Sequence, residues 1–488
     1  MNHGLIFNLS YFPLSQRPLG PYRIAHYLRE QGMDIEVVEY AMFWSLDELK
    51  ELAKSRITSN TKFIGTSHMF YSWSEEFDNF LSWVKGNYPD ITVISGSAAF
   101  PGFTSKNIDY YIRGYGESAI TAILKGEKVK TELKFPDRKV VDAIHNYPSY
   151  PMNSLMVKYE DRDFLQPWEY VGIEFSRGCK FKCAFCNYPI LGVKGDYSRD
   201  AEDARIQMQD TYDRFGVTNY IVSDDTFNDR TEKVTKFADM VEDLSFKPYF
   251  TGFVRADLLA SRPMDKVELA RMGFNGHYYG IESFNTPSAR AIGKGMESEK
   301  LLAGLLDAKD YIEKTNGKIY RATIGLIVGL PYETEITLER TKQWLIDNWQ
   351  GQNFIPWPLE IYNPYSGVEN LSSISMNFEK YGYKHIDTKK EFNGGTLTEK
   401  YSPLGERFYW DNGIMDYGRA QELSEQIRSL ENDYDFRFTP FDMQGMHIAN
   451  SELSLEELLQ RKTDQLKHWD SIDRLKHVKE YINKKLSL

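Results

Sequence analysis

The sequence predicts an α/β protein in three parts: a Rossmann-like parallel sheet, a partial (β/α)6 barrel, and a small, mostly helical C-terminal domain. Three observations predict it. Short apolar strands alternate with helical stretches over residues 1–125, and a second alternating series begins near Tyr170. Such alternation gives parallel sheets that helices cover. The length of 488 residues exceeds that of one ordinary domain.

The first series predicts a domain over residues 1–125. An apolar strand over 4–9 precedes a helix over 21–32, where Ile24, Ala25 and Leu28 have helical spacing and Gly32 is a stop signal. A ligand of this domain would lie at the carboxyl ends of the strands. The further expected strands cover 35–38, 63–66, 92–95 and 110–112, and the further expected helices cover 46–53 and 75–88.

The rest of the chain divides into a connector, a barrel and a C-terminal domain that covers the substrate. Residues 126–168 carry charged and proline-containing stretches, which predict a connector. Residues 169–375 suit an open β/α barrel with its chemistry at the carboxyl ends of the strands. Residues 376–488 are polar and aromatic and then helical, with a capping box at Ser454, and we expect them to cover the substrate. The expected barrel strands cover 171–175, 220–223, 249–253, 276–279, 320–328 and 355–361.

The composition narrows the partners and the location. The chain has 70 Asp and Glu against 59 Lys and Arg, a net charge of −11, so its overall field repels phosphate and argues against a nucleic-acid partner. No apolar run is long enough to cross a membrane, and the N-terminus lacks the features of a signal peptide. We therefore expect a cytoplasmic protein with no membrane partner.

Cysteine usage is the most informative feature of the composition. The chain has only three cysteines, Cys179, Cys183 and Cys186, spaced Cys-x3-Cys-x2-Cys after an expected strand. A clustered, odd set without a secretory signal is a poor disulfide framework and a good metal site. Three thiolates can bind three irons of a [4Fe–4S] cluster and leave the fourth iron open. A structural zinc site needs a fourth ligand, and the next histidine along the chain is the distant His277.

The cysteine motif resembles that of the radical S-adenosylmethionine (SAM) superfamily. The resemblance covers roughly residues 170–370 and implies that the open iron is chelated by the amino and carboxylate groups of SAM. It also implies that an electron from the cluster cleaves SAM into methionine and a 5′-deoxyadenosyl radical, which takes a hydrogen atom from the substrate. The three cysteines would then be catalytic, and an electron donor such as flavodoxin or ferredoxin is expected.

Further residues resemble positions at which the superfamily contacts SAM, at the ends of successive strands. Each has a structural alternative, because acidic residues at strand ends are often helix caps and Gly-x-x-x-Gly in a strand often marks close packing. The order and spacing of the set make it specific. The cofactor-binding residues that the resemblance implies are Phe185, Asp224, Asp225, Arg255, Glu282, Ser283, Gly325, Gly329 and Glu333.

The N-terminal part also resembles a known domain. Pro18-Leu19-Gly20-Pro21-Tyr22 and Arg113-Gly114-Tyr115-Gly116-Glu117 look like parts of the cobalamin-binding domain that one large subclass of the superfamily carries. Two departures leave cobalamin binding open. The Asp-x-His-x-x-Gly element, whose histidine ligates cobalt in many cobalamin proteins, is absent, and the usual Gly-Gly pair appears as Gly96-Ser97. His68, near the end of an expected strand, faces either a ligand or solvent.

The resemblance implies an enzyme that modifies an unactivated C–H position of a small molecule or peptide. With cobalamin, the natural reaction is methyl transfer; without it, the alternatives are radical rearrangement or epimerisation. The lack of further cysteines for a second cluster counts against methylthiolation. A tRNA-modifying enzyme would be expected to carry a basic C-terminal β-module, whereas residues 376–488 are mixed in charge. A non-catalytic protein with a structural metal would not need strand-end carboxylates such as Glu282 and Glu333.

Overall fold

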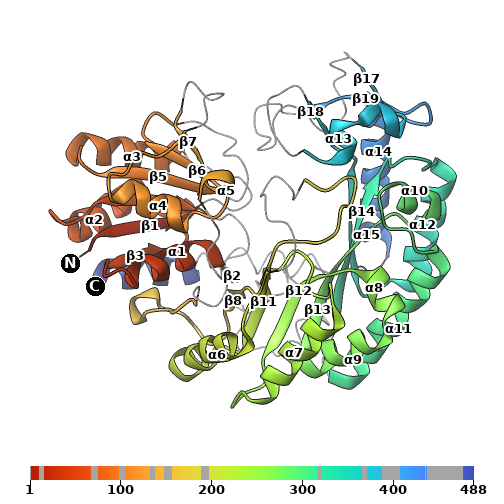
Figure 1. The fold of residues 1–488 in the computed structure, drawn as a ribbon, viewed down its shortest axis with the longest axis horizontal. Helices are drawn as coiled ribbons and strands as arrows, with labels where there is room; N and C mark the ends of the chain where they lie inside the picture. Colours follow the sequence, from red (N-terminus) through yellow and green to blue (C-terminus); the bar gives the residue numbers. More distant parts are fainter. Residues whose placement is uncertain are drawn as a thin grey trace.

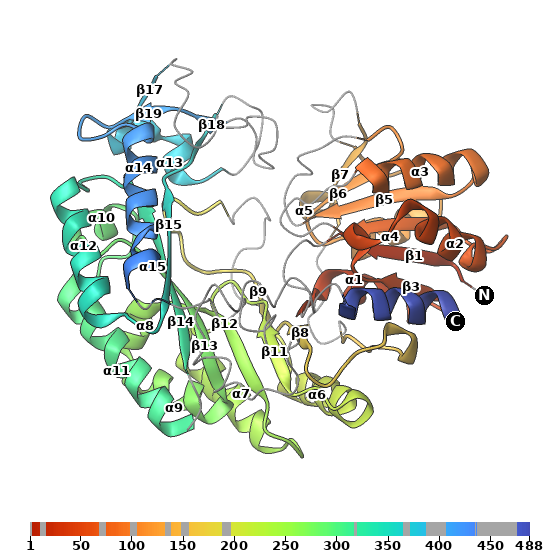
Figure 2. The same ribbon diagram turned by 180° about the vertical axis from the view of Figure 1, so that it is seen from behind.

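Two parallel β-sheets, each flanked by helices, form the protein in the computed structural model (Figures 1 and 2). The predicted α/β fold class is confirmed. The structure describes residues 2–9, 16–67, 75–97, 105–131, 138–147, 156–187, 197–316, 320–364, 371–386, 407–434, 436 and 476–488.

The first sheet has six parallel strands in the order β3-β1-β4-β5-β6-β7. Chain order reverses between β1 and β4, which is the point where doubly wound sheets bind ligands. The strands are β1 Gly4–Asn8, β3 Ile35–Val38, β4 Phe63–Ser67, β5 Thr92–Ser97, β6 Tyr110–Arg113 and β7 Val140–Asp142. The helices are α1 Leu19–Arg29, α2 Leu46–Arg56, α3 Glu75–Asn87, α4 Glu117–Leu124 and α5 Ala143–Asn146.

Alternation along β1 decides which helices cover which face. Leu5 and Phe7 belong to a buried cluster with side chains of α2 and α3, and the Phe7 ring lies 5.3 Å from that of Phe80. Ile6, between them, belongs to the cluster of α1 and α4. Successive side chains of a strand point to opposite faces, so one apolar pentapeptide supports both layers of helices.

The second sheet is also parallel, with the order β15-β14-β13-β12-β11-β8-β2. Its edge strand β2, Gln16–Arg17, comes from the N-terminal part of the chain and pairs with β8. The other strands are β8 Tyr170–Ile173, β11 Asn219–Val222, β12 Tyr249–Val254, β13 Phe274–Glu282, β14 Arg321–Val328 and β15 Asn353–Pro358. The helices that follow them are α6 Ala201–Phe215, α7 Thr231–Glu242, α8 Ala256–Ser261, α9 Pro263–Met272, α10 Thr286–Ala291, α11 Ser298–Asn316 and α12 Glu335–Asn348.

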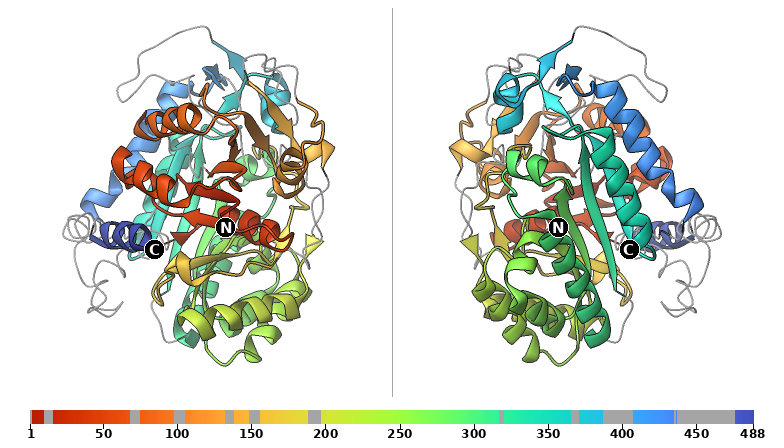
Figure 3. Two further views of the ribbon diagram at one scale, coloured as in Figure 1. Left: turned by 90° about the vertical axis from the view of Figure 1, so that its left-hand side faces the viewer. Right: turned by 90° about the vertical axis from the view of Figure 1, so that its right-hand side faces the viewer.

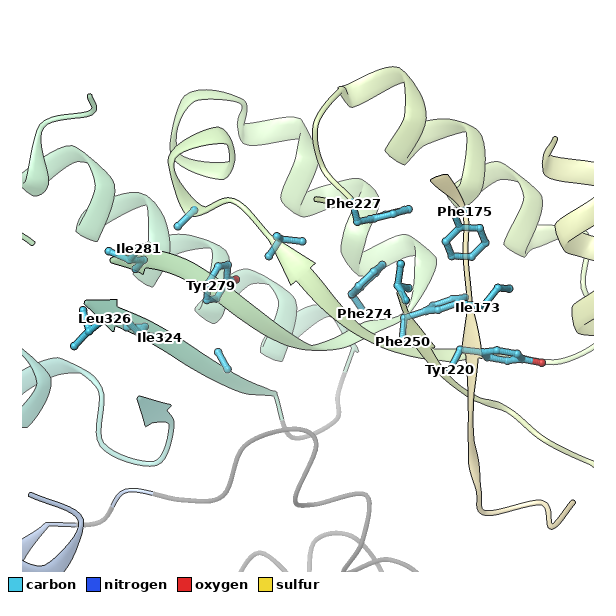
Figure 4. Close-up of a cluster of buried hydrophobic side chains, with 14 of the residues drawn as sticks. Ile173, Phe175, Tyr220, Phe227, Phe250, Phe274, Tyr279, Ile281, Ile324 and Leu326 are labelled. Atoms are coloured by element: carbon cyan, nitrogen blue, oxygen red, sulfur yellow. The ribbon is translucent and has the colours of Figure 1, made fainter. Parts of the chain in front are cut away.

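Aromatic side chains fill the space between the second sheet and its helices. Phe175 packs on Phe237 of α7 with ring centroids 4.4 Å apart, and Phe250 packs on Phe274 at 5.5 Å. Figure 4 shows these sheet residues on the helix side, beside Phe227. This explains the high aromatic content of the chain as packing, which leaves the other face of the sheet to the site.

The described part of the C-terminal region lies in two places. The short elements after β15 and helix α14, Tyr417–Arg428, pack at the β14 and β15 side of the second sheet. Residues 476–487 form a helix that lies on the first sheet's side, where the C-terminus is near the N-terminus (Figures 1 and 3). The remaining short elements are β16 Ile361–Tyr362, α13 Ser373–Met376, β17 Lys384–His385, β18 Arg407–Phe408, β19 Trp410–Asp411 and α15 Leu430–Asp433.

Most expected elements are present, with ends shifted by one to three residues. Two strands of the two large sheets were missed, as were the short strands of the two-stranded sheets. Strand β7 lies inside the predicted connector and pairs with β6, and β2 is only two residues long. The domain boundaries at 125, 168 and 375 stay predictions, and the Ser454 capping box lies outside the described residues. Across the residues that the structure describes, we find no helix that is both long enough and apolar enough to cross a membrane.

A buried ion pair joins β2 to the segment that precedes β8. Arg17 donates from Nε and Nη2 to the two carboxylate oxygens of Glu169 at 2.8 and 3.0 Å, and both side chains are fully buried. Tyr40 donates its hydroxyl to Glu169 at 3.0 Å, and Arg17 donates to the hydroxyl of Tyr22 at 3.0 Å. Burial opposes the charged form of Arg17, but Glu169 together with Tyr22, Tyr40 and Glu39 outweighs it and raises the pKa of the guanidinium.

Replacing Glu169 by Gln leaves Arg17 buried without a counter-charge. We expect Glu169→Gln to lower the free energy of unfolding by about 3 kcal/mol, measured by urea denaturation. The matched control is Glu202→Gln, which removes the exposed partner of Arg205 on α6 and should change the free energy of unfolding far less, because water screens an exposed pair. Equal losses in the two variants would contradict the role given to the Arg17–Glu169 pair.

Candidate functional site

The three cysteines lie on the loop that follows β8. Strand β9, Ser176–Arg177, pairs with β10, Tyr197–Ser198, and Gly178 then turns the chain with a φ of +96°. All three cysteines are half-buried, and none of them forms a disulfide. Ala184, between two of them, donates its N–H to Ile292 O and accepts from Ile374 N–H, so the loop is fixed from two sides.

Asp224, at the end of β11, fastens the start of the cysteine loop. Its Oδ1 accepts the Phe175 N–H at 2.8 Å and its Oδ2 accepts the Ser176 hydroxyl at 2.6 Å. Burial raises the pKa of Asp224 to about 6, against the opposing effect of Lys233. Both oxygens are engaged within the protein, whereas the neighbouring Asp225 is exposed. The expected SAM contacts of both residues stay predictions, and the geometry of Asp224 explains its presence without one.

Arg255, which follows β12, is the charged group next to a cysteine. Its Nη1 donates to Cys183 Sγ at 3.2 Å, and its guanidinium lies 4.0 Å from the centroid of the Phe181 ring. Asp257 accepts from the other side of the guanidinium, from Nε at 3.0 Å. Burial works against the charge, but Asp257 and Cys183 raise the pKa of Arg255. A fixed cation therefore faces one of the thiols, where it stabilises thiolate charge.

Glu282, at the end of β13, is paired with a lysine beside the cysteine loop. Lys294 forms an ion pair with Glu282 and donates to Gly280 O at 2.5 Å. A Cβ on Gly280 would lie 2.8 Å from Glu282 Oε1, so glycine is required for the carboxylate to lie there. Lys294 also lies 5.9 Å from the centroid of the Phe185 ring. The structure thus brings together Glu282 and Phe185, which were predicted separately, and Lys294, which was missed.

Glu333 is buried behind the ends of β13 and β14. It accepts the Ser283 hydroxyl at 2.8 Å and the Gly329 N–H at 2.8 Å, and burial raises its pKa to about 7. Gly329 has a φ of +95°, and a Cβ there would lie 2.4 Å from the Trp410 ring. The absence of a side chain at Gly325 leaves room for Tyr278, whose hydroxyl lies 2.6 Å from where a Cβ would be. The four predicted contacts Ser283, Gly325, Gly329 and Glu333 have structural partners, and their SAM contacts stay predictions.

Sequence reasoning missed Lys294, Asp257 and Thr226. Thr226 Oγ1 lies 3.7 Å from Cys179 Sγ. Lys294 stands between two glycines, and Gly293, with a φ of +84°, approaches Lys182 O of the cysteine loop. The sequence signal that could have identified Lys294 is its position between two glycines, soon after the glutamate that ends a strand. Asp257 could have been predicted as the ion-pair partner of Arg255, because it follows that arginine by two residues.

The donor set fits an iron–sulfur cluster. In the described part of the chain, no three His, Cys, Asp or Glu side chains converge on a single metal ion. The cysteines offer three soft thiolates from one loop, and the N–H of Arg255 supplies the donor that a ligating sulfur accepts. This is the chemistry of a site in which each thiolate binds a different iron.

Comparison with known proteins identifies the domain that carries the cysteines. Residues 173–345 match the sequence profile of the Radical SAM superfamily. This chain carries a radical SAM domain. The domain contains all three cysteines and strands β11 to β14, so the predicted superfamily is confirmed.

Two curated relatives match part of the chain. A putative methylthiotransferase of Methanocaldococcus jannaschii is 26% identical over 294 residues, which are 58% of this chain and 63% of that protein. An uncharacterized methyltransferase of Pyrococcus horikoshii is 24% identical over 291 residues, 56% of this chain and 61% of that protein. The matches therefore span less than two thirds of either relative.

Solved structures of radical SAM enzymes share the fold over almost the whole chain. The methyltransferase TsrM of Kitasatospora setae, with cobalamin and a [4Fe–4S] cluster bound, has a TM-score of 0.62 at 12% identity and covers 98% of this chain and 100% of its own. OxsB, a cobalamin-dependent enzyme with aqua-cobalamin bound, has a TM-score of 0.60 at 16% identity, covering 98% and 71%. The likeness confirms the predicted order of a Rossmann-like sheet and a radical SAM barrel.

The buried carboxyl group of Glu333 makes stability depend on pH. Its pKa is about 7 in the folded protein against an ordinary 4.5, so the folded state holds more protons than the unfolded state between these values. The free energy of unfolding therefore falls as pH rises through this window, by roughly 3 kcal/mol for this group. We expect Glu333→Gln to lose less stability than the wild type between pH 5 and pH 8, measured by urea denaturation.

The control is Glu335→Gln, two residues away. Glu335 is exposed, and its hydrogen bond to Arg419 lowers its pKa, so it does not titrate between pH 5 and pH 8. This variant should keep the pH dependence of the wild type. A Glu333→Gln variant with an unchanged pH dependence would contradict the protonation assigned to Glu333.

Proposed function

We propose that this protein is a radical SAM methyltransferase, with a [4Fe–4S] cluster on Cys179, Cys183 and Cys186 and cobalamin at the first sheet. The observation that carries the proposal is the loop of three cysteines without a disulfide that follows β8, with Arg255 donating to Cys183. When bound, the reduced cluster supplies the electron that cleaves SAM, and cobalamin supplies a methyl carrier.

Residues of the chain itself fix the position of the cysteine loop and place charges beside it. Arg255 places a positive charge against Cys183, which favours the thiolate that iron binds. Asp224 and Ser176 fix where the cysteine loop begins. Lys294 and Glu282 offer one cation and one carboxylate near Phe185, which suit the carboxylate and ammonium groups of an amino acid such as the methionine part of SAM.

The first sheet supports the cobalamin part of the proposal. Strand β4, at the switch point, and its neighbour β5 end in small residues, and among the described residues a Cβ on Gly96 would meet nothing nearer than Thr66 O at 3.9 Å. This open edge leaves room for a large flat cofactor. Two solved structures with this fold are described with cobalamin bound. His68 and the side chain of Ser97 lie outside the described residues.

The reaction and partners follow from the same residues. With three cysteines in the whole chain, one cluster uses them all, and methylthiolation through a second cysteine-bound cluster is disfavoured. We propose a small molecule or peptide as the methyl acceptor and a flavodoxin or ferredoxin as the electron donor. A reducing cytoplasm would keep the thiols available for iron.

SAM cleavage tests the radical chemistry. After anaerobic reconstitution with iron and sulfide, we expect the wild type with dithionite and SAM to form 5′-deoxyadenosine, measured by liquid chromatography and mass spectrometry. Cys183→Ala should lose this product because the cluster loses one ligand. The control, Lys182→Ala, changes an exposed neighbour in the same loop and should keep it. A fully loaded wild type that leaves SAM intact would overturn the proposal.

Corrin binding tests the second cofactor separately. After incubation with hydroxocobalamin and desalting, the wild type should keep the corrin absorbance bands. Gly96→Leu should lose them, because the new side chain enters the open edge without a clash inside the folded protein. Gly86→Leu, on the exposed part of α3 with nothing within 4 Å, is the control that should bind as the wild type does. If the wild type does not retain corrin, the reaction is a cobalamin-independent rearrangement or epimerisation.

A further inference from the structure

A closed ring of four buried charges joins the first sheet's helices to the cysteine loop. Arg177 donates from Nε to Glu174 at 2.7 Å and from Nη2 to Glu117 at 3.1 Å. Arg23 of α1 forms an ion pair with Glu174 and lies with its Nε 3.6 Å from Glu117. The charges alternate around the ring and sum to zero. No side chain in it is more than 7% exposed.

The ring is part of the cysteine loop. Arg177 precedes Cys179 by two residues, which places their backbones at most about 7 Å apart. The Tyr115 ring, from the loop after β6, lies 3.7 Å from the Arg177 guanidinium. Glu117 is the first residue of α4, after that same loop. The carboxyl edge of the first sheet therefore contributes a charge and an aromatic ring to the residue beside the first cysteine.

Stability alone does not explain this arrangement. Burying four charges costs desolvation free energy, and apolar residues of the same volume often stabilise a protein at least as well. A buried charge is also weakly screened, so each member acts on its neighbours over longer distances than a surface charge does. The pKa of Glu174 agrees with these contacts, since burial would raise it and the guanidiniums of Arg23 and Arg177 lower it below its usual value, whereas burial lowers the pKa of Arg23 itself.

We propose that Glu117 and Arg177 are positioning residues that set the electrostatic balance at the cysteine-bound cluster from the N-terminal domain. The inference rests on the proposed function for the cluster itself. A cluster gains negative charge when it is reduced, so a nearby anion opposes reduction and a nearby cation favours it. Glu117 lowers the reduction potential in this arrangement, and Arg177 raises it.

The test uses opposite charge changes in the reconstituted full-length holoenzyme. At one fixed redox poise, electron paramagnetic resonance measures the fraction of reduced cluster, with and without SAM. Glu117→Gln should raise the ratio of reduced to oxidised cluster severalfold, and Arg177→Gln should lower it severalfold. The double variant should return towards the wild type. A purely structural role would move both single variants in the same direction, which would overturn the proposal.

Three further variants keep the test decisive. Asp142→Asn breaks another buried pair, with Arg113 at 2.7 Å, that joins β6 to β7, and it should leave the ratio unchanged. Glu117→Asp keeps the charge and should restore the wild-type ratio. If Arg177→Gln does not load iron, Glu117→Gln decides the matter, together with Arg177→Lys, which keeps the charge. A wild type without a reducible cluster overturns the proposed function as well, whereas a normal cluster unmoved by Glu117→Gln overturns this inference alone.

Discussion

Charge buried between the two sheets is the constraint on which the rest of the structure depends. Arg17, Arg23 and Arg177 are almost fully buried; Arg23 and Arg177 each face a carboxylate from across the junction between the sheets, and Arg17 faces Glu169, which accepts from Tyr40 of the first sheet's side. A buried charge that loses its partner costs several kcal/mol. The sheets therefore cannot slide past each other without leaving one of these groups unpaired. Because the ring around Arg177 includes the start of the cysteine loop, the same constraint places the thiols.

The carboxylates at the strand ends of the barrel are of two kinds: some accept hydrogen bonds within the protein through both oxygens, and one is paired with a lysine. Asp224 and Glu333 use both of their oxygens inside the protein, and burial raises both pKa values. Glu282 is instead paired with Lys294 near Phe185, in a backbone conformation with a φ of +65° that non-glycine residues rarely adopt. The strained residue is the one that we propose contacts a ligand. The relaxed ones hold the loops that carry the site.

Much of the fold and the centre of the site could be predicted from the sequence. The cysteine spacing and the alternation of strands and helices are local patterns, and they identified the radical SAM domain and the two sheets. Strand β2 was missed because two residues carry no periodic signal, and β7 was missed because it follows a charged stretch. The roles of Asp224 and Glu333 were not readable, since a strand-end carboxylate has the same sequence signal whether it binds a ligand or the backbone. The ring of Arg23, Glu117, Glu174 and Arg177 joins residues up to 154 positions apart, which no single-sequence pattern reveals.

The helix over 476–487 shows how the chain closes over the junction. Tyr481 accepts the Glu39 N–H at 3.0 Å, and its ring lies 5.4 Å from the Arg17 guanidinium. Lys485 is fully buried and lies 2.9 Å from Glu36, and burial lowers the pKa of the lysine although Glu36 opposes this effect. Strand β2 brings Arg17 to the second sheet, so the last helix covers the same ion pair from the side of the first sheet. The two ends of the chain thus converge on Arg17 and Glu169, beside the start of β8, the strand that leads into the cysteine loop.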